Sequence, residues 1–303
     1  MEQKNAVGRF APTPSGRMHL GNVFAALMAW LSVRSKGGRM VLRMEDLDTQ
    51  RTSADFASVL RSDMEWLGLD WDVETAPQSR RSEVYDRYFR ILEERGLLYP
   101  CYCTRSQLHS VNAPHLSDGT YVYPGTCRNL AEAPAGRKPA WRVMVPDKLW
   151  QLHDLVQGDY ELNLATQCGD MVVRRADGVY VYQLAVTVDD GEAGVTEVVR
   201  GMDLLSSAPR QMYLQELFGF AHPVYAHVPM LLAPDGRRLS KRDRDLDLGV
   251  LRQRMTPEAL IGNLAFAAGL IRKNEPISAY DLAGEFSWEK IRGDAIYLDG
   301  GAL

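Results

Sequence analysis

The chain has 303 residues, 46% hydrophobic and 24% charged, which is typical of a globular protein and excludes an intrinsically disordered one. Its formal net charge of −4 argues against a surface that coats nucleic acid by charge alone, although it allows a local basic face. The longest apolar runs, residues 23–31 and 264–271, are too short to span a bilayer, and residues 1–5 are not followed by an apolar signal core. We therefore expect a cytoplasmic protein.

A turn rich in proline and glycine lies within residues 8–22, which read Gly-Arg-Phe-Ala-Pro-Thr-Pro-Ser-Gly-Arg-Met-His-Leu-Gly-Asn. We expect a short apolar strand before the turn and a helix after it, because its two prolines forbid helix until the turn is finished. His19 and Asn22 are three residues apart, so they project from one face of the first helical turn. The free N–H groups of a helix N-terminus suit a phosphate. The plainer alternative is an ordinary strand-to-helix turn that an asparagine caps.

A second strand is expected over residues 40–44, and the order strand, helix, strand predicts a parallel βαβ unit. Ligands in such sheets bind beyond the carboxyl ends of the strands, where Arg9 and Glu45 would both emerge. Ser53 and Ser82 are expected to open two further helices, the second of which runs to Arg95.

All four cysteines lie in a loop-rich segment, residues 99–178, which we interpret as an insertion with its own fold. Cys101 and Cys103 are too close in sequence to form an unstrained disulfide with each other, and the cytoplasm is a reducing compartment. Together with Cys127 they supply three neighbouring thiolates, which favours a structural zinc site. Three free cysteines without a metal are the plainer alternative.

The fourth ligand of such a zinc site stays open from spacing alone. His109 and His115 are favoured, because imidazole is a far commoner zinc ligand than a phenol. Cys168 is a further candidate, although it lies much further along the chain.

The second half of the chain is expected to combine strands and helices. A turn at residues 177–178 predicts a β-hairpin formed by residues 171–175 and 179–188. A strand over residues 197–199 leads to Arg200, and a helix is expected over residues 208–218. Beyond Asp247 the chain is expected to be mainly helical.

A basic stretch, Arg-Arg-Leu-Ser-Lys-Arg at residues 237–242, follows an apolar run over residues 228–233 and a turn at residues 235–236. A loop this basic at the end of a strand suits a polyphosphate leaving group. A solvated run of charges is the plainer alternative.

Taken together, residues 9–22 and 238–242 resemble the HIGH and KMSKS signatures of class I aminoacyl-tRNA synthetases, and the first of them resembles the glutamyl type. The chain is most similar to a family of short paralogues, the glutamyl-queuosine tRNA(Asp) synthetases. Residues 243–303 are too few for the anticodon-binding domain of the long enzymes. The Cys-x-Cys followed by Tyr-x-x-x-Cys is similar to the paralogues' zinc module, and the hexapeptide Arg-Gly-Met-Asp-Leu-Leu that begins at Arg200 resembles theirs.

The resemblance implies a role for each matching residue. The residues that would bind glutamate are Arg9, Phe10, Ala11, Pro12, Thr13, Glu45, Tyr182 and Arg200. The residues that would bind ATP are His19, Asn22, Ser240 and Lys241, and among these His19, Asn22 and Lys241 would be catalytic. The zinc ligands would be Cys101, Cys103, Tyr123 and Cys127.

The resemblance also implies the fold and its division. The expected fold is α/β, with a Rossmann-like parallel sheet, a zinc-containing insertion and a small helical C-terminal region. The catalytic domain would comprise residues 1–98 and 179–242, the second half carrying the KMSKS-like loop, with the insertion at residues 99–178 and the helical region at residues 243–303.

The expected function is ATP-dependent activation of L-glutamate as glutamyl-adenylate, followed by transfer to the queuosine base of tRNA(Asp). The expected cofactors are one structural Zn²⁺ per chain and Mg²⁺ with ATP, and a monomer is expected. Within the same class, the alternative is a truncated glutamyl-tRNA synthetase that charges the tRNA 3′ end. From other classes, the alternatives are a nucleotidyltransferase that makes a small-molecule adenylate and an inactive tRNA-binding protein. The presence of His19, Asn22, Ser240 and Lys241 weighs against an inactive protein.

Overall fold

A largely parallel sheet forms the centre of the protein in a computed structural model, which describes residues 6–104, 107, 122–237 and 247–298. Within these residues its strands stand in the order β3-β2-β1-β9-β10-β6-β7. Neighbouring strands pair in parallel, except that β6 and β7 form an antiparallel hairpin at one edge. The strands are β1 (Val7–Phe10), β2 (Arg39–Leu42), β3 (Val73–Glu74), β6 (Leu149–Asp154), β7 (Gly158–Asn163), β9 (Glu197–Gly201) and β10 (Val224–Val228).

The direction in which strands are added to the sheet reverses beside β1. From β1 the chain passes through helix α1 (Leu20–Arg34) to β2 and then to β3, whereas β9 and β10 lie on the other side of β1. Such a reversal opens a crevice beyond the carboxyl ends of the two central strands. The expected α/β fold with a parallel sheet is confirmed.

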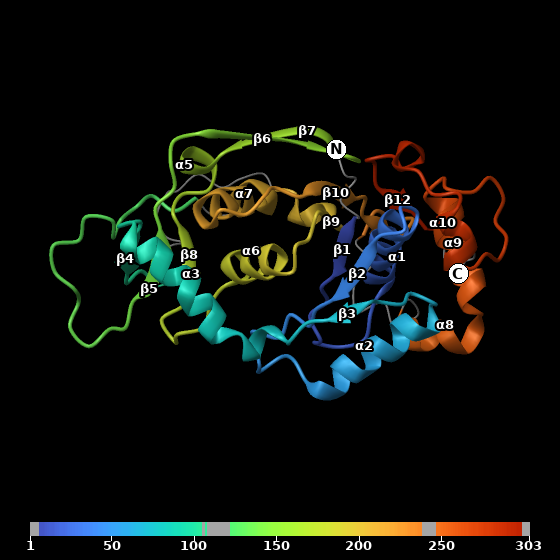
Figure 1. The fold of residues 1–303 in the computed structure, drawn as a ribbon, viewed down its shortest axis with the longest axis horizontal. Coiled ribbons are helices and arrows are strands. Elements are labelled where there is room, and N and C mark those ends of the chain that lie inside the picture. The colour runs from blue at the N-terminus through green and yellow to red at the C-terminus, as the bar shows by residue number, and fades with distance from the viewer. Residues whose placement is uncertain (1–5, 105–106, 108–121, 238–246, 299–303) are drawn as a thin grey trace.

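The cysteine-bearing sheet and the C-terminal helices lie at opposite ends of the molecule, with the central sheet between them (Figure 1). The first consists of the antiparallel strands β4 (Leu98–Cys101), β5 (Ala140–Val143) and β8 (Met171–Arg174). The C-terminal helices are α8 (Leu248–Arg254), α9 (Pro257–Ala267) and α10 (Ala279–Ala283). A two-stranded parallel ladder of β11 (Leu231–Leu232) and β12 (Ile296–Tyr297) joins this end to the chain beyond β10.

The two helices expected to begin at Ser53 and Ser82 are confirmed, although only Ser53 caps its helix with its side chain and Arg81 is the N-cap residue of the second. Helix α2 (Ala54–Trp66) begins after Ser53, whose Oγ accepts a hydrogen bond from the backbone N–H of Phe56 at 3.1 Å. Helix α3 (Ser82–Glu94) begins at Ser82, and helix α7 (Ser207–Phe218) matches the expected helix over residues 208–218. The remaining short elements are α5 (Leu164–Gln167), η1 (Gln78–Arg80), η2 (Met202–Leu204) and η4 (Trp288–Lys290).

The hairpin expected from residues 171–175 and 179–188 is wrong in its second strand. Residues Tyr182–Glu192 form helix α6 instead, and an isolated bridge between Arg174 and Tyr180 is the only pairing of that region with β8 that the described residues make. The interior of α6, from Leu184 to Asp190, is buried without a break. A helix buried on all sides gives an unbroken apolar run, which periodicity alone cannot distinguish from a buried strand.

The boundaries expected at residues 98, 178 and 242 stay a prediction. One feature inside the expected insertion belongs to the central sheet, because β6 and β7 extend its edge beside β10. In the part of the chain that the structure describes, every helix is too short or too polar to cross a bilayer.

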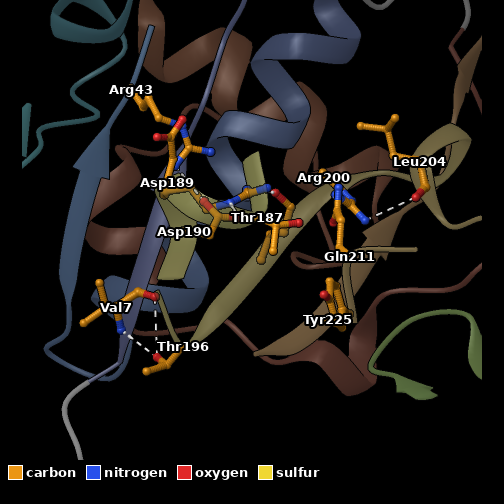
Figure 2. A network of polar contacts seen from close by, with 12 residues as sticks. Val7, Arg43, Thr187, Asp189, Asp190, Thr196, Arg200, Leu204, Gln211 and Tyr225 are labelled. Carbon is orange, nitrogen blue, oxygen red and sulfur yellow. Dashed lines mark hydrogen bonds and ion pairs between the residues drawn. The ribbon is translucent and has the colours of Figure 1, made fainter. Parts of the chain in front are cut away.

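A cluster of buried ions ties α6 to the two strands beside it. Asp190 of α6 pairs with Arg43 at 2.7 Å and with Arg9 of β1 at 3.3 Å, and the Arg43 side chain is fully buried. Figure 2 shows Arg43 beside Asp189 and Asp190. Burial alone would raise the pKa of Asp190, but the guanidinium groups of Arg43 and Arg9 hold that pKa below its ordinary value. Asp190 is therefore ionised and holds two buried cations.

The Asp190→Asn substitution is expected to lower the free energy of unfolding by about 3–5 kcal/mol, because it leaves the buried guanidinium group of Arg9 without its paired carboxylate and removes one of the three carboxylates around Arg43. Urea unfolding followed by circular dichroism measures the change. The matched control is Glu216→Gln, which breaks an exposed pair with Lys148 (3.2 Å) and is expected to cost less than about 1 kcal/mol. Equal, small losses in both variants would contradict the role of Asp190.

Candidate active site

A cavity of about 510 Å³ opens beyond the carboxyl ends of β1 and β9, in the crevice that the strand order creates. Its lining includes every predicted glutamate or ATP residue that the structure describes, namely Arg9, Phe10, Ala11, Pro12, Thr13, His19, Asn22, Glu45, Tyr182 and Arg200. The predicted Ser240 and Lys241 lie outside the described residues, as do His109 and His115. The structure therefore brings together the described members of the set, although their roles stay a prediction.

The floor of the cavity is the turn between β1 and α1. Its backbone is fixed against the strand beside it, because the N–H of Glu45 donates to the carbonyl of Pro12 at 3.0 Å. His19 is the N-cap residue of α1, and its carbonyl accepts from the N–H of Asn22 at 2.9 Å. Gly21 leaves room for the His19 ring, since a Cβ there would lie 3.1 Å from a ring carbon. The helix thus begins at the cavity with its N-terminal dipole end, which favours an anion.

Glu45 is the carboxylate of the cavity wall. Its side chain is 10% exposed and accepts a hydrogen bond from Arg43 at 3.1 Å. Burial raises the pKa of Glu45, and the positive charges of Arg43 and Arg9 offset only part of that rise. A cationic group of a ligand would stabilise the ionised form of this side chain.

Arg200 on β9 is a cation that lines the same cavity. It is buried, and its Nη1 lies 3.5 Å from the hydroxyl of Tyr182, the first residue of α6. Burial raises the pKa of Tyr182 although Arg200 acts against that rise, so the phenol is a neutral donor. The cavity therefore presents a carboxylate and a guanidinium with a phenol beside it, which suits a ligand that carries both charges.

The three cysteines expected to bind a metal do lie together, far from the cavity. The sulfur atoms of Cys101, Cys103 and Cys127 lie within 4.8 Å of one another, and the Tyr123 hydroxyl lies 3.5 Å from the first sulfur and 3.9 Å from the second. A tetrahedral zinc with sulfur ligands at 2.3 Å requires ligand separations of about 3.8 Å. The donors present therefore fit such an ion. Cys168 is not a member of this group, and its sulfur accepts a hydrogen bond from Arg210 at 3.0 Å.

The surroundings shift the pKa values of two of these thiols in opposite directions. Burial alone would raise the pKa of Cys101, but hydrogen bonds from Tyr123 and Arg142 hold that pKa below its ordinary value. Burial, together with the hydrogen bond to Cys127, raises the pKa of Cys103 to about 11. Arg142 also stacks on the Tyr123 ring, with its guanidinium carbon 3.5 Å from the ring centroid.

A family model of the catalytic domain of class I tRNA synthetases (E and Q) matches residues 5–275. The chain belongs to this family. It is therefore a ligase of the aminoacyl-tRNA synthetase class, and the resemblance stated from the sequence is confirmed.

Relatives of this synthetase from several bacteria carry the name glutamyl-Q tRNA(Asp) synthetase. The one from Nitratidesulfovibrio vulgaris is 44% identical over 296 residues, which cover 92% of this chain and 91% of the relative. The one from Thiobacillus denitrificans is 47% identical over 244 residues, 80% of each chain. Among solved structures, glutamate-tRNA synthetase from Elizabethkingia anophelis superposes with a TM-score of 0.84 at 27% identity, over 99% of this chain and 69% of that one.

The sequence did not reveal several polar residues that support the synthetase site. Asp190 and Arg43 hold Arg9 and Glu45 in place, and Gln211 accepts a hydrogen bond from Arg200 at 2.8 Å. The signal that could have found Asp190 is the pair of adjacent acids at the end of an apolar run in residues 184–190. Buried acids of this kind need cationic partners.

Proposed function

We propose that this synthetase activates L-glutamate with ATP and transfers the glutamyl group to queuosine in the anticodon loop of tRNA(Asp). The observation that carries the proposal is the grouping of Arg9, Glu45, Tyr182 and Arg200 in one cavity at the start of α1. This set complements glutamate, which has one ammonium and two carboxylate groups. The names of the relatives support the same substrate and the same tRNA.

Glutamate would bind by its charges. The carboxylate of Glu45 would meet the α-ammonium group, and Arg200 with Tyr182 would meet the side-chain carboxylate. The remaining N–H group of Arg200 and the hydroxyl of Tyr182 can both donate to a carboxylate, and a guanidinium offers no acceptor to the amide N–H groups of glutamine. Selection of glutamate over glutamine would follow from this difference.

Activation requires alignment and charge neutralisation rather than a protein nucleophile. An α-carboxylate oxygen of glutamate forms a bond to the α-phosphorus of ATP, and the bond to the bridging oxygen breaks so that pyrophosphate leaves. His19, Asn22, Ser240 and Lys241 would hold the phosphates, with the N-terminus of α1 behind them. Mg²⁺ would enter with ATP, held mainly by the phosphates, and would neutralise part of their charge.

Transfer needs a hydroxyl acceptor at the glutamyl carbonyl. Queuosine carries a cyclopentene-diol, which resembles the 2′,3′-diol of a terminal ribose, so the same geometry can serve for both. One of its hydroxyl oxygens would attack the carbonyl carbon and lose its proton, and AMP would leave. Proteins read RNA sequence mostly in single-stranded loops, which is where this base lies.

A second candidate is transfer to the terminal adenosine of a tRNA. The observation that favours it is the close superposition on glutamate-tRNA synthetases, one of which was solved in complex with its amino acid. Both candidates share the activation step, so only the identity of the tRNA acceptor distinguishes them.

At the cysteine cluster we propose one structural zinc ion, held by Cys101, Cys103, Tyr123 and Cys127. The ion would close the loop that contains these residues and would take no part in the transfer of glutamate. The distances among the four donors support this set, and Tyr123 also accepts a hydrogen bond from the N–H of Cys127 at 2.9 Å.

The acceptor is tested with labelled glutamate and three tRNAs. Glutamate transfer is expected to queuosine-containing tRNA(Asp), with none to queuosine-free tRNA(Asp) and little to tRNA(Glu). Nuclease digestion locates the label in the anticodon loop or at the 3′ end. Efficient charging of the terminal adenosine of tRNA(Glu) would contradict transfer to queuosine and support the second candidate function.

The role of Lys241 is tested with Lys241→Ala. Loss of this cation is expected to slow glutamate-dependent ATP–pyrophosphate exchange by about 100–1000-fold, because charge that develops on the phosphates is no longer neutralised. The matched control is Lys273→Ala, an exposed lysine outside the cavity, with melting temperatures as a check of folding. Near-normal exchange by a folded Lys241→Ala protein would remove Lys241 from the mechanism.

The zinc site is tested by metal analysis of the purified protein. About one zinc per chain is expected, and Cys101→Ser should lose it, whereas Cys168→Ser should keep it because that sulfur lies outside the cluster. Tyr123→Phe, compared with His109→Ala and His115→Ala, assigns the fourth ligand. Metal-free protein from a zinc-replete preparation would contradict the proposal.

A further inference from the structure

A chain of three buried polar side chains lies behind the cavity, on three neighbouring strands of the central sheet. Arg200 on β9 donates from Nε to Nε2 of His227 on β10 at 2.9 Å. The Nδ1 atom of His227 lies 2.6 Å from a carboxylate oxygen of Asp154, the last residue of β6. The side chains of His227 and Asp154 are both fully buried.

The partners fix where the proton of His227 lies. A guanidinium can only donate, so Nε2 of His227 must be the acceptor and the ring proton must be on Nδ1, facing Asp154. Burial lowers the pKa of His227, and the hydrogen bond to Asp154 only partly opposes that effect. The ring is therefore neutral. Asp154 is the charged member, and its Oδ1 accepts from the backbone N–H groups of Val156 at 3.0 Å and Gln157 at 2.9 Å.

The two terminal nitrogens of the Arg200 guanidinium group make further contacts. Nη1 donates to the side-chain oxygen of Gln211 at 2.8 Å, and Nη2 donates to the carbonyl of Leu204 at 3.2 Å, a contact drawn in Figure 2. Gln211 is itself held by Gln183 at 3.1 Å. Nη1 also lies 3.5 Å from the hydroxyl of Tyr182. These contacts leave one of the five N–H groups of Arg200, on Nη2, for a ligand in the cavity.

Arg200 differs from the other two arginines of the site in the charge of its partners. Arg9 and Arg43 pair directly with the carboxylate of Asp190. Within the described part of the chain, no carboxylate pairs directly with Arg200, and its Nε meets a neutral imidazole instead. A carboxylate at that position would neutralise the cation that a ligand carboxylate needs. The neutral imidazole orients the guanidinium without balancing its positive charge, which can then attract a ligand carboxylate.

We propose that His227 and Asp154 are positioning residues that aim Arg200 at the side-chain carboxylate of the amino acid and so set the preference for glutamate over glutamine. The inference rests on the proposed function, in which Arg200 reads that carboxylate. Asp154 acts through the tautomer of His227, and His227 acts through the orientation of Arg200.

Asp154→Asn is the sharpest test, because the backbone N–H groups of Val156 and Gln157 hold the oxygen of the asparagine amide. Its NH₂ group then faces Nδ1 of His227, and the ring proton moves to Nε2, where it opposes the N–H of Arg200. The expected result is an increase of about 10–100-fold in KM for glutamate with the KM for ATP unchanged, since a hydrogen bond to a charged group is misdirected. The ratio of kcat/KM for glutamate to that for glutamine should fall by a similar factor, as it should in Arg200→Ala.

The matched control is Asp159→Asn on β7, which alters an exposed His–Asp pair of the same hairpin, with 2.7 Å between Asp159 and His153. It should change neither KM nor the glutamate preference. A merely structural role of Asp154 would lower the active fraction, and hence kcat, without moving the preference. An unchanged preference in folded Asp154→Asn therefore overturns the inference.

Two variants of His227 serve if Asp154→Asn does not fold. His227→Phe keeps a ring beside Tyr225, on which His227 stacks, but removes the acceptor, so the preference should be lost. His227→Gln restores an acceptor and should recover part of it. Equal preferences in both variants and the wild type overturn the inference. A wild-type protein without glutamate-dependent exchange, in the presence of tRNA, overturns the proposed function and the inference with it.

Discussion

The arrangement of the cavity depends on one carboxylate, that of Asp190, held between two buried arginines. A carboxylate without counter-charge could not remain ionised at this depth, and Arg9 could not remain buried without its carboxylate partner. Arg43 has Glu45 and Asp189 as further partners. The pairs join α6 to β1 and to the end of β2, which are distant in sequence. Arg9 and Glu45 thereby reach the cavity from separate strands with fixed orientations. The cost of burying these ions is offset by their mutual attraction, so the site is charged but internally balanced.

Three buried arginines at or behind the cavity, Arg9, Arg43 and Arg200, have different electrostatic roles. Arg9 pairs with Asp190, and Arg43 pairs with Asp190, Glu45 and Asp189, so the charges of both arginines are largely balanced by protein carboxylates. Arg200 has a neutral imidazole as its closest partner on Nε, so more of its field reaches the cavity. A binding site for a dicarboxylic amino acid needs this asymmetry. A fully neutralised wall would attract glutamine as well as glutamate, and an unbalanced set of three buried cations would not fold.

The sequence predicted the lining of the cavity well and its support poorly. Motifs such as the turn before His19 are local, so the sequence alone could identify their residues as candidates for the site. The predicted glutamate and ATP residues that the structure describes all line one cavity. The supporting pairs are long-range: Arg43 and Asp190 are 147 residues apart, and Arg9 and Asp190 are 181 apart. Nothing in the local pattern specifies such pairing. Helix α6 was missed for a related reason, because burial on all sides removes the helical periodicity.

The cysteine-bearing sheet is connected along the chain to a strand that supports the cavity. Strand β5 belongs to the cysteine-bearing sheet, and β6, which follows it in the chain, extends the central sheet and ends at Asp154. Asp170, next to β8, holds this end together by accepting from the hydroxyl of Tyr99 at 2.6 Å and from the N–H of Val145 at 2.9 Å. A metal at the cysteines would therefore stabilise the segment that delivers Asp154 behind Arg200.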